Sequence, residues 1–90
     1  MKFISSAIKI FPKNRYPVVV CGKRHPDCLE LIANLEVDRD RSEDVQGFIV
    51  LNDDGYKMFV DRIEGAQIAK ELGYHLDYPN CLYSETIWPE

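Results

Sequence analysis

The sequence predicts an α+β domain in which two β-hairpins form one antiparallel sheet and two helices cover one face of it. Two stretches of strand-like residues, each interrupted by turn formers, are both followed by a helix-start signal. At 90 residues the chain is the length of one domain, so we expect a single domain over residues 1–90. The predicted order is β-β-α-β-β-α, followed by a C-terminal tail.

The first hairpin is predicted from an alternating stretch at residues 3–11 and an apolar run at residues 18–21. Between them, residues 12–17 carry a proline at each end and break the strand. Period-two alternation places one set of side chains on a single face of the first strand. This set is Ile4, Ser6, Ile8 and Ile10.

The first helix is predicted to begin near Pro26, because a proline in the first turn removes an N–H that has no partner there. Asp27 and Glu30 complement the positive end of the helix dipole. Helical spacing predicts an apolar face that also includes a neighbouring leucine. Its members are Leu29, Ile32, Leu35 and Leu31. The charged stretch at 36–46 then reads as an exposed loop.

The second hairpin and helix carry the clearest local signals. Residues 52–55, Asn-Asp-Asp-Gly, are turn formers between two apolar runs. Asp61 is a predicted helix N-cap, and Gly73 is predicted to end that helix. The tail over residues 75–88 has no clean period, and its apolar side chains could pack on its own sheet or on a second copy of the chain.

Composition excludes several classes of protein. The chain has 15 acidic and 11 basic residues and a formal charge of −4, whereas proteins that grip duplex nucleic acid need a broad basic surface. Any anion site must therefore be small and local. Three is an odd number of cysteines, so they cannot all pair within one chain, and we expect no full disulfide framework. No stretch is long and apolar enough to span a bilayer, and the N-terminal stretch is too short and too polar for a secretory signal. We expect a soluble protein of a reducing cytoplasm.

The candidate ligand-binding residues lie around the starts of the two predicted helices. Arg24 and His25 stand at the first helix start, where unpaired N–H groups and the helix dipole favour anions. Arg62 stands in the first turn of the second helix, where a cation opposes the dipole unless an anion or a carboxylate neutralises it. On the preceding strand, Lys57 adds charge, and Phe59 offers a ring to a base or joins the core. Surface cations on loops are the simpler alternative.

The sequence gives little support for a metal site or for a catalytic site. Cys21, His25 and Cys28 have a C-x3-H-x2-C spacing that Cys81 or His75 could complete, but the usual C-x2-C knuckle is absent and buried free cysteines are common. The sequence contains no P-loop, no G-x-S-x-G and no G-x-G-x-x-G. We therefore expect no cofactor, no metal and no enzymatic activity.

Three segments resemble a known family. They are VVCGKRHPDCLELI, QGFIVLNDDGYKMFVDRIEGAQIAKELG and LYSETIW, which together cover about half of the chain. Their order and spacing resemble the G-x-R-H, Q-G-F, R-F-V-D-R-E-E-A and L-Y-S-E-D-L-W series of the type-one Thoeris anti-defence proteins. These are phage proteins that sequester cyclic ADP-ribose-type immune signals in the host cytoplasm.

The resemblance implies a non-catalytic binder that forms homo-oligomers, with dimers grouped into hexamers, and some members are thought to bind cyclic oligonucleotides in separate pockets. By position, Arg24 and His25 match the G-x-R-H turn, while Phe59 and Arg62 match the aromatic and the second arginine of R-F-V-x-R. The first arginine of that motif is replaced by Met58 here.

The sequence thus predicts a phage protein that captures a small cyclic nucleotide signal and holds it intact. The predicted ligand-binding residues are Arg24, His25, Lys57, Phe59 and Arg62. The partners expected are this nucleotide and further copies of the chain, in a dimer or hexamer, with neither a membrane nor duplex nucleic acid. The alternative is a small phage inhibitor that binds a host protein through the 36–46 loop and the apolar tail.

Overall fold

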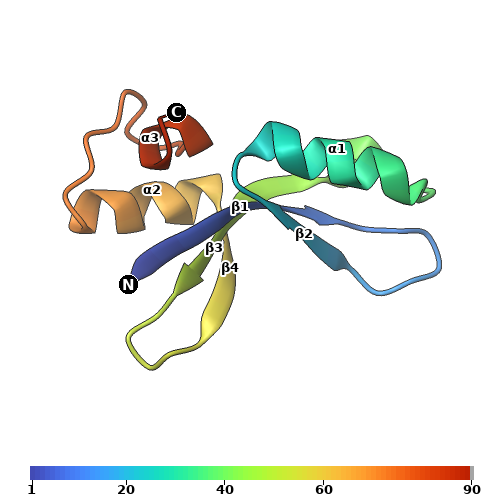
Figure 1. The fold of residues 1–90 in the computed structure, drawn as a ribbon, viewed down its shortest axis with the longest axis horizontal. Helices are drawn as coiled ribbons and strands as arrows, with labels where there is room; N and C mark the ends of the chain where they lie inside the picture. The colour runs from blue at the N-terminus through green and yellow to red at the C-terminus, as the bar shows by residue number, and fades with distance from the viewer. Residues whose placement is uncertain (90) are drawn as a thin grey trace.

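The computed structural model describes residues 1–89 and confirms the predicted α+β fold (Figure 1). One antiparallel sheet has the strand order β2-β1-β3-β4. Its strands are β1 (Lys2–Ile10), β2 (Val18–Gly22), β3 (Val45–Leu51) and β4 (Lys57–Asp61). The helices are α1 (His25–Leu35), α2 (Arg62–Glu71) and the short α3 (Ser84–Ile87), with a 3-10 turn, η1 (Arg41–Glu43), before β3.

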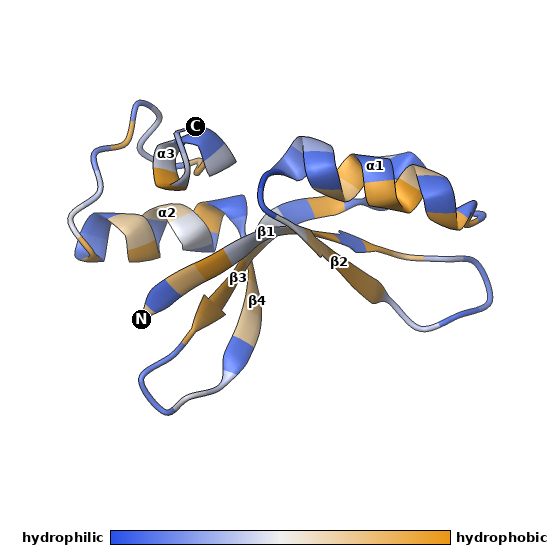
Figure 2. Ribbon diagram, viewed as in Figure 1, coloured by the Kyte–Doolittle hydropathy of each residue, from blue (hydrophilic) through white to orange (hydrophobic). Residues whose placement is uncertain are grey.

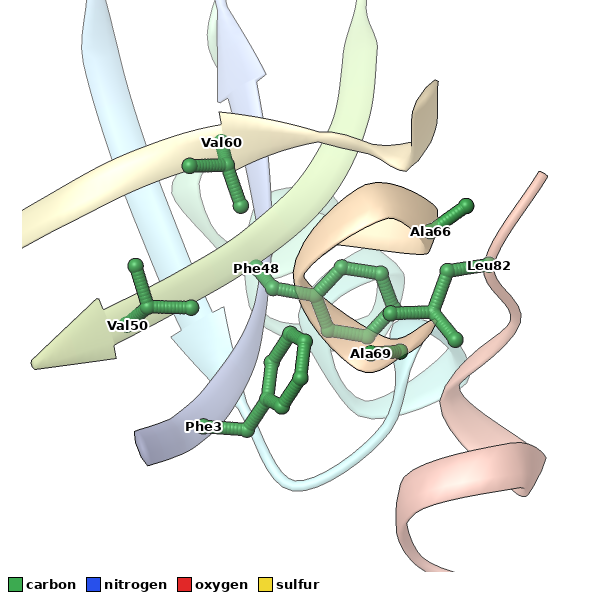
Figure 3. Packing of buried hydrophobic residues seen from close by; sticks show 7 residues of the cluster. All are labelled: Phe3, Phe48, Val50, Val60, Ala66, Ala69 and Leu82. Carbon is green, nitrogen blue, oxygen red and sulfur yellow. The ribbon is translucent and has the colours of Figure 1, made fainter. Parts of the chain in front are cut away.

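Both long helices lie on the same face of the sheet, α1 against β1 and β2 and α2 against β3 and β4. Two hydrophobic clusters fill the space beneath them. The larger one, under α2, is drawn in Figure 3 and comprises Phe3, Phe48, Val50, Val60, Ala66, Ala69 and Leu82. The smaller one, under α1, comprises Ile8, Ile10, Val20, Cys28 and Ile32.

The predicted face of the first strand is correct except at Ile4. Phe3 pairs with Val50 and Ser5 pairs with Ile49, so Ile4 is an extra residue in a β-bulge. The bulge shifts the alternation by one position: Phe3 is buried and Ile4 is 39% exposed. The period-two prediction was wrong here because a bulge breaks the alternation on which it rests.

The apolar face predicted for the first helix is also partly wrong. Helix α1 buries Ile32 and Cys28, whereas Leu29, Leu31 and Leu35 are 46%, 48% and 54% exposed. The helix covers only the β1–β2 half of the sheet, so a narrow stripe of its surface meets the core. The leucines on both flanks of that stripe are left at the surface.

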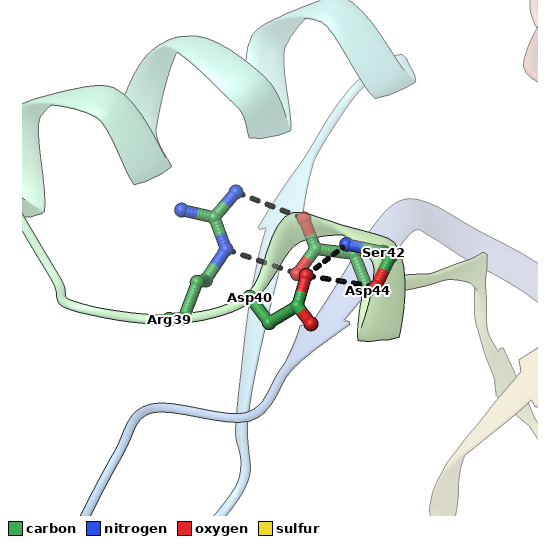
Figure 4. Close-up of polar contacts among 4 residues, drawn as sticks. All are labelled: Arg39, Asp40, Ser42 and Asp44. Atoms are coloured by element: carbon green, nitrogen blue, oxygen red, sulfur yellow. Dashed lines mark hydrogen bonds and ion pairs between the residues drawn. The ribbon is translucent and has the colours of Figure 1, made fainter.

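The 36–46 stretch, predicted to be a solvated loop, is ordered by polar contacts (Figure 4). Arg39 donates two hydrogen bonds to the Asp44 carboxylate, at 2.9 and 2.8 Å, and both side chains are largely shielded from solvent. Asp40 accepts from the amide and the hydroxyl of Ser42 and so caps η1. A bidentate ion pair of this kind fixes loop geometry as well as adding energy.

The local signals of the second hairpin and helix are confirmed. The Asn52 side chain accepts from the amides of Asp54 and Tyr56 and closes the turn, in which Gly55 has a φ of +88°. Asp61 caps α2 by accepting from the second and third amides of the helix. Gly73, with a φ of +91°, lies just beyond the C-terminal end of α2.

The tail packs on its own chain through Leu82 and Trp88, which is one of the two alternatives that the sequence left open. Leu82 is fully buried in the larger cluster, and its amide donates to the Arg62 carbonyl at 3.1 Å. The Trp88 ring lies 6.4 Å from the ring of Phe48. No helix within residues 1–89 combines the length and the apolar character that crossing a membrane would require.

At Gly47 on β3, an added side chain would run into the backbone of β4. A Cβ at this position would lie 2.0 Å from the Val60 carbonyl oxygen and 2.8 Å from the Phe59 ring. We expect Gly47→Ala to lower the free energy of unfolding by more than about 2 kcal/mol, because backbone cannot give way as a side chain can. Urea denaturation followed by far-UV circular dichroism measures this.

Gly65→Ala is the matched control for that substitution. Its Cβ would lie 3.2 Å from side-chain atoms of Leu82 and Phe48. The helix propensity gained, about 1 kcal/mol, offsets part of this crowding, so a smaller change is expected. Equal stability of Gly47→Ala and the wild type would contradict the close approach of β3 and β4.

Candidate functional site

The structure brings the starts of the two long helices together near the middle of the molecule, from which the helices run in opposite directions (Figure 1). His25 is the first residue of α1 and Arg62 is the first residue of α2. The two side chains are close enough for the Arg62 charge to lower the pKa of His25. The sequence-based expectation that these two residues share one region is therefore consistent with the geometry.

Arg62 is held against the C-terminal tail. Its guanidinium carbon lies 4.6 Å from the centre of the Tyr83 ring, a cation–π arrangement. Its Nε atom is buried and has no hydrogen-bond partner within residues 1–89. A buried donor without a partner costs about 1–3 kcal/mol, so an acceptor that reached it would be bound favourably.

Two surface hollows meet beside this pair at Cys81. One, of about 490 Å³, includes Arg62 and Asp61 in its lining. The other, of about 380 Å³, includes Tyr83 and Tyr78, whose rings are 5.5 Å apart and nearly perpendicular. Both volumes fall in the range of small-molecule sites.

His25 is a buried residue, with 4% of its surface exposed. Its Nε2–H donates to the Gly47 carbonyl at 2.8 Å, and its ring meets the Phe48 ring edge-on at 5.1 Å. Burial is the main cause of its lowered pKa. The Gly47 hydrogen bond opposes this effect, the Arg62 charge lowers the pKa further, and Glu85 raises it by the smallest amount. Neutral His25 therefore has its only N–H committed, which favours a structural role over contact with an anion.

Three of the predicted site residues have other surroundings. Lys57 and Phe59 lie on the face of the sheet opposite the helices, because they alternate with the buried Val60. The Phe59 ring covers Gly47 there. Arg24 is half-buried at the cap position of α1, and its amide donates to the Asp27 carboxylate at 3.1 Å.

The cysteines do not converge. Cys21 is exposed on β2, and Cys28 is buried beneath α1, where burial raises the pKa of its thiol to about 11. Cys81 is partly exposed in the tail. Within residues 1–89, no three His, Cys, Asp or Glu side chains are placed to hold a metal ion.

The model of the phage T4 y16D protein family matches residues 3–88, which is nearly the whole chain. The chain belongs to the phage T4 y16D protein family. No curated protein and no solved structure matches it. The match to the y16D family supports a phage protein, and it carries no information on Thoeris signals, nucleotides or anti-defence.

In this y16D-family protein, the tail supplies site residues that we did not predict. Tyr83 stacks on Arg62, Tyr78 contacts Tyr83, and the Ser84 hydroxyl lies 3.5 Å from the His25 amide. The Leu-Tyr-Ser-Glu stretch at 82–85 was one of the segments that carried the family resemblance, so the sequence did contain a signal. The fold was needed to place that stretch beside Arg62.

Because the pKa of His25 is lowered in the folded protein, stability should fall as the pH drops below about 6.5, the ordinary value for histidine. In that window the unfolded chain takes up a proton on His25 and the folded protein resists it. For one histidine the slope cannot exceed about 1.4 kcal/mol per pH unit. Urea denaturation at pH values between 5 and 7.5 measures the effect.

His25→Gln should flatten this dependence, whereas His75→Gln, at an exposed position outside the core, should keep it. Asp40 and Asp53 have lowered pKa values, so their contributions are lost only at more acidic pH. A His25→Gln variant with the same pH slope as the wild type would show that His25 is not the group responsible.

Proposed function

We propose that this phage-family protein binds a small cyclic nucleotide signal of the cyclic ADP-ribose type and holds it without cleaving it. The observation that carries the proposal is the Arg62–Tyr83 pair: an arginine with a buried, unpartnered Nε–H, stacked on an exposed tyrosine between two hollows. The resemblance of the three sequence segments to type-one Thoeris anti-defence proteins supplies the ligand class.

Arg62 would hold a phosphate group. Hydrogen bonds from a guanidinium to phosphate are charge-assisted and are about twice as strong as neutral ones. In the described structure the Arg62 side chain forms no ion pair with a carboxylate. Its charge is thus available to a ligand.

Tyr83 and Tyr78 would receive the base. Stacking of a base on an aromatic ring contributes about 1–3 kcal/mol and tolerates different bases. Tyr83 and Tyr78 are 36% and 62% exposed, so their rings are accessible from the second hollow. Lys57 and Phe59, on the opposite face of the sheet, would join this site only if another copy of the chain brought them to it.

Some of the carboxylates near Arg62 are already paired within the protein, so they would repel a bound anion less than free carboxylates would. Asp61 is committed to two amides of α2, and Asp44 is paired with Arg39. Glu85 and Asp77 are exposed carboxylates that line the second hollow. A ligand that also carries hydroxyl donors, as a ribose does, would match this mixture of charges better than a simple phosphate.

Mass spectrometry of small molecules released by heat from the purified protein tests the proposal. The protein is first incubated with cyclic ADP-ribose isomers and cyclic oligonucleotides. Recovery of one of them chemically unchanged after long incubation is the expected result. Recovery of an altered ligand would indicate an enzyme, and a stable complex with a host protein and no nucleotide uptake would favour the direct inhibitor.

Replacing Arg62 by Ala should weaken nucleotide binding about 10- to 100-fold, the equivalent of about 1.5–3 kcal/mol for hydrogen bonds to a charged group. Isothermal titration with the ligand identified by mass spectrometry measures it. Tyr83→Ala should weaken binding, and Tyr83→Phe should restore most of it because the ring face is kept.

Lys70→Ala is the matched control, since Lys70 is an exposed cation in the last turn of the same helix. Its affinity should equal that of the wild type. If Arg62→Ala bound the ligand as tightly as Lys70→Ala while remaining folded, Arg62 would not be part of the site.

A further inference from the structure

The face of the sheet opposite the helices has a surface of its own, which we call the open face. Both long helices pack on the other face, and within residues 1–89 no helix covers this one (Figure 1). The strand register arranges its side chains in successive rows across the sheet. These rows are Lys2, Leu51 and Lys57; Ser5, Ile49 and Phe59; Cys21, Ala7, Gly47 and Asp61; and Val19, Lys9 and Val45.

The Phe59 ring lies along the open face near its centre. A Cβ at Gly47 would be 2.8 Å from this ring, so the ring leans over the neighbouring strand instead of standing out from β4. Ala7, which pairs with Gly47, is fully buried although no helix lies above it. Phe59 itself is half-buried, so part of its ring is accessible to a ligand.

Lysines stand at both ends of the open face. Lys2 and Lys57 share one row and are two strand spacings apart, about 10 Å, whereas Lys9 lies roughly 20 Å from that row. The Lys9 Nζ is 5.8 Å from the centre of the Phe11 ring, so a second half-buried aromatic adjoins this end. Figure 2 shows strands coloured mainly apolar, with hydrophilic segments where β1 and β4 begin.

The open face is positive in a protein that is negative as a whole. None of its three lysines forms an ion pair within residues 1–89. The carboxylate in its rows, Asp61, is committed to two amides of α2. At the margins, Asp53 and Asp44 are already in ion pairs, whereas Asp54 and Glu43 are exposed. Three free cations on one face of a chain with a formal charge of −4 indicate an anionic partner.

We propose that the open face binds linear single-stranded nucleic acid, with phosphates held by the three lysines and a base stacked on Phe59. Proteins that bind single strands without sequence preference combine cations along the backbone with aromatic rings under the bases. A four-stranded sheet with its helices on one face and aromatics on the other is a common platform for single-stranded RNA. A duplex would need a broader basic surface than this chain has.

The spacing of the cations favours an extended partner. Lysines about 10 and 20 Å apart cannot share one small anion, whereas a strand passes them in turn. At about 3.4 Å per nucleotide in a stacked strand, this length holds at most about six nucleotides. A half-buried ring that lies on the sheet is also poorly placed to insert into a lipid bilayer. The open face lies across the sheet from the Arg62–Tyr83 pair, so this proposal is independent of the nucleotide site proposed above.

Fluorescence anisotropy of the full chain with labelled strands about ten nucleotides long, oligothymidylate and oligouridylate, tests the proposal. A Kd of about 10⁻⁴–10⁻⁶ M at physiological salt is expected. Three phosphate contacts predict that log K falls with log salt with a slope near about −2, because each contact contributes about −0.7 on a single strand. A duplex of the same length should bind more weakly, because its bases are already stacked on each other and cannot reach Phe59.

Substitutions on the open face separate charge from stacking. Lys9→Gln and Lys57→Gln should each weaken binding and make the salt slope shallower by about 0.7. Phe59→Leu, which keeps an apolar side chain over Gly47, should weaken binding about 5- to 100-fold at an unchanged slope. Lys70→Gln, at an exposed cation of α2 on the other side of the sheet, is the matched control and should bind as the wild type does. Circular dichroism checks that each variant is folded.

A wild type that binds neither strand at low salt would overturn the proposal. So would folded Lys9→Gln and Lys57→Gln variants that bind as tightly as Lys70→Gln, because the strand would then lie elsewhere. Equal affinity for the strand and the duplex would rule out stacking on Phe59. Vesicles containing phosphatidylserine are the last arm, and binding to them without strand binding would identify an anionic membrane as the partner instead.

Discussion

Strands β3 and β4 approach each other closely at Gly47, and several other contacts depend on this approach. The position has no room for a side chain beyond its backbone, so the Phe59 ring can cover it on one face of the sheet. The Gly47 carbonyl accepts the ring N–H of His25 and thereby ties the start of α1 to the middle strands. The next residue, Phe48, is fully buried and contacts the rings of Phe3 and His25. A glycine, a histidine and a phenylalanine thus connect the two halves of the domain.

That connection sets the positions of the helix starts, and with them the candidate site. His25 begins α1 and Arg62 begins α2, and the tail passes over both with Leu82 in the core and Tyr83 on the guanidinium. Burial, and to a smaller extent the Arg62 charge, lowers the pKa of His25 and favours its neutral form, so Arg62 is the cation beside the tail. The candidate site therefore combines the Arg62 charge with the exposed rings of Tyr83 and Tyr78.

The family assignment and the geometry bear on different parts of the function. Membership in the phage T4 y16D protein family covers residues 3–88 and supports a phage protein. The nucleotide ligand rests on the Arg62–Tyr83 pair and on the resemblance of short motifs.

The sequence by itself determined the order of elements and the local signals that begin and end them. The hydrogen bonds of Asp61, Gly73 and the Asn52 turn join residues at most four positions apart along the chain. Their roles could therefore be predicted from the sequence alone. Its choice of Arg62 as a site residue, made because a cation in a first helical turn is unfavourable without a partner, stays a prediction.

For several other residues, only the tertiary structure decided which face they occupy. The bulge at Ile4 depends on the pairing of β1 with β3, and the exposure of Leu31 and Leu35 depends on how little of the sheet α1 covers. Lys57 and Phe59 were expected beside Arg62, yet they lie across the sheet from it because strand alternation opposes them to Val60. Such placements are set by register and packing between residues far apart in sequence, and local periodicity carries no information about them.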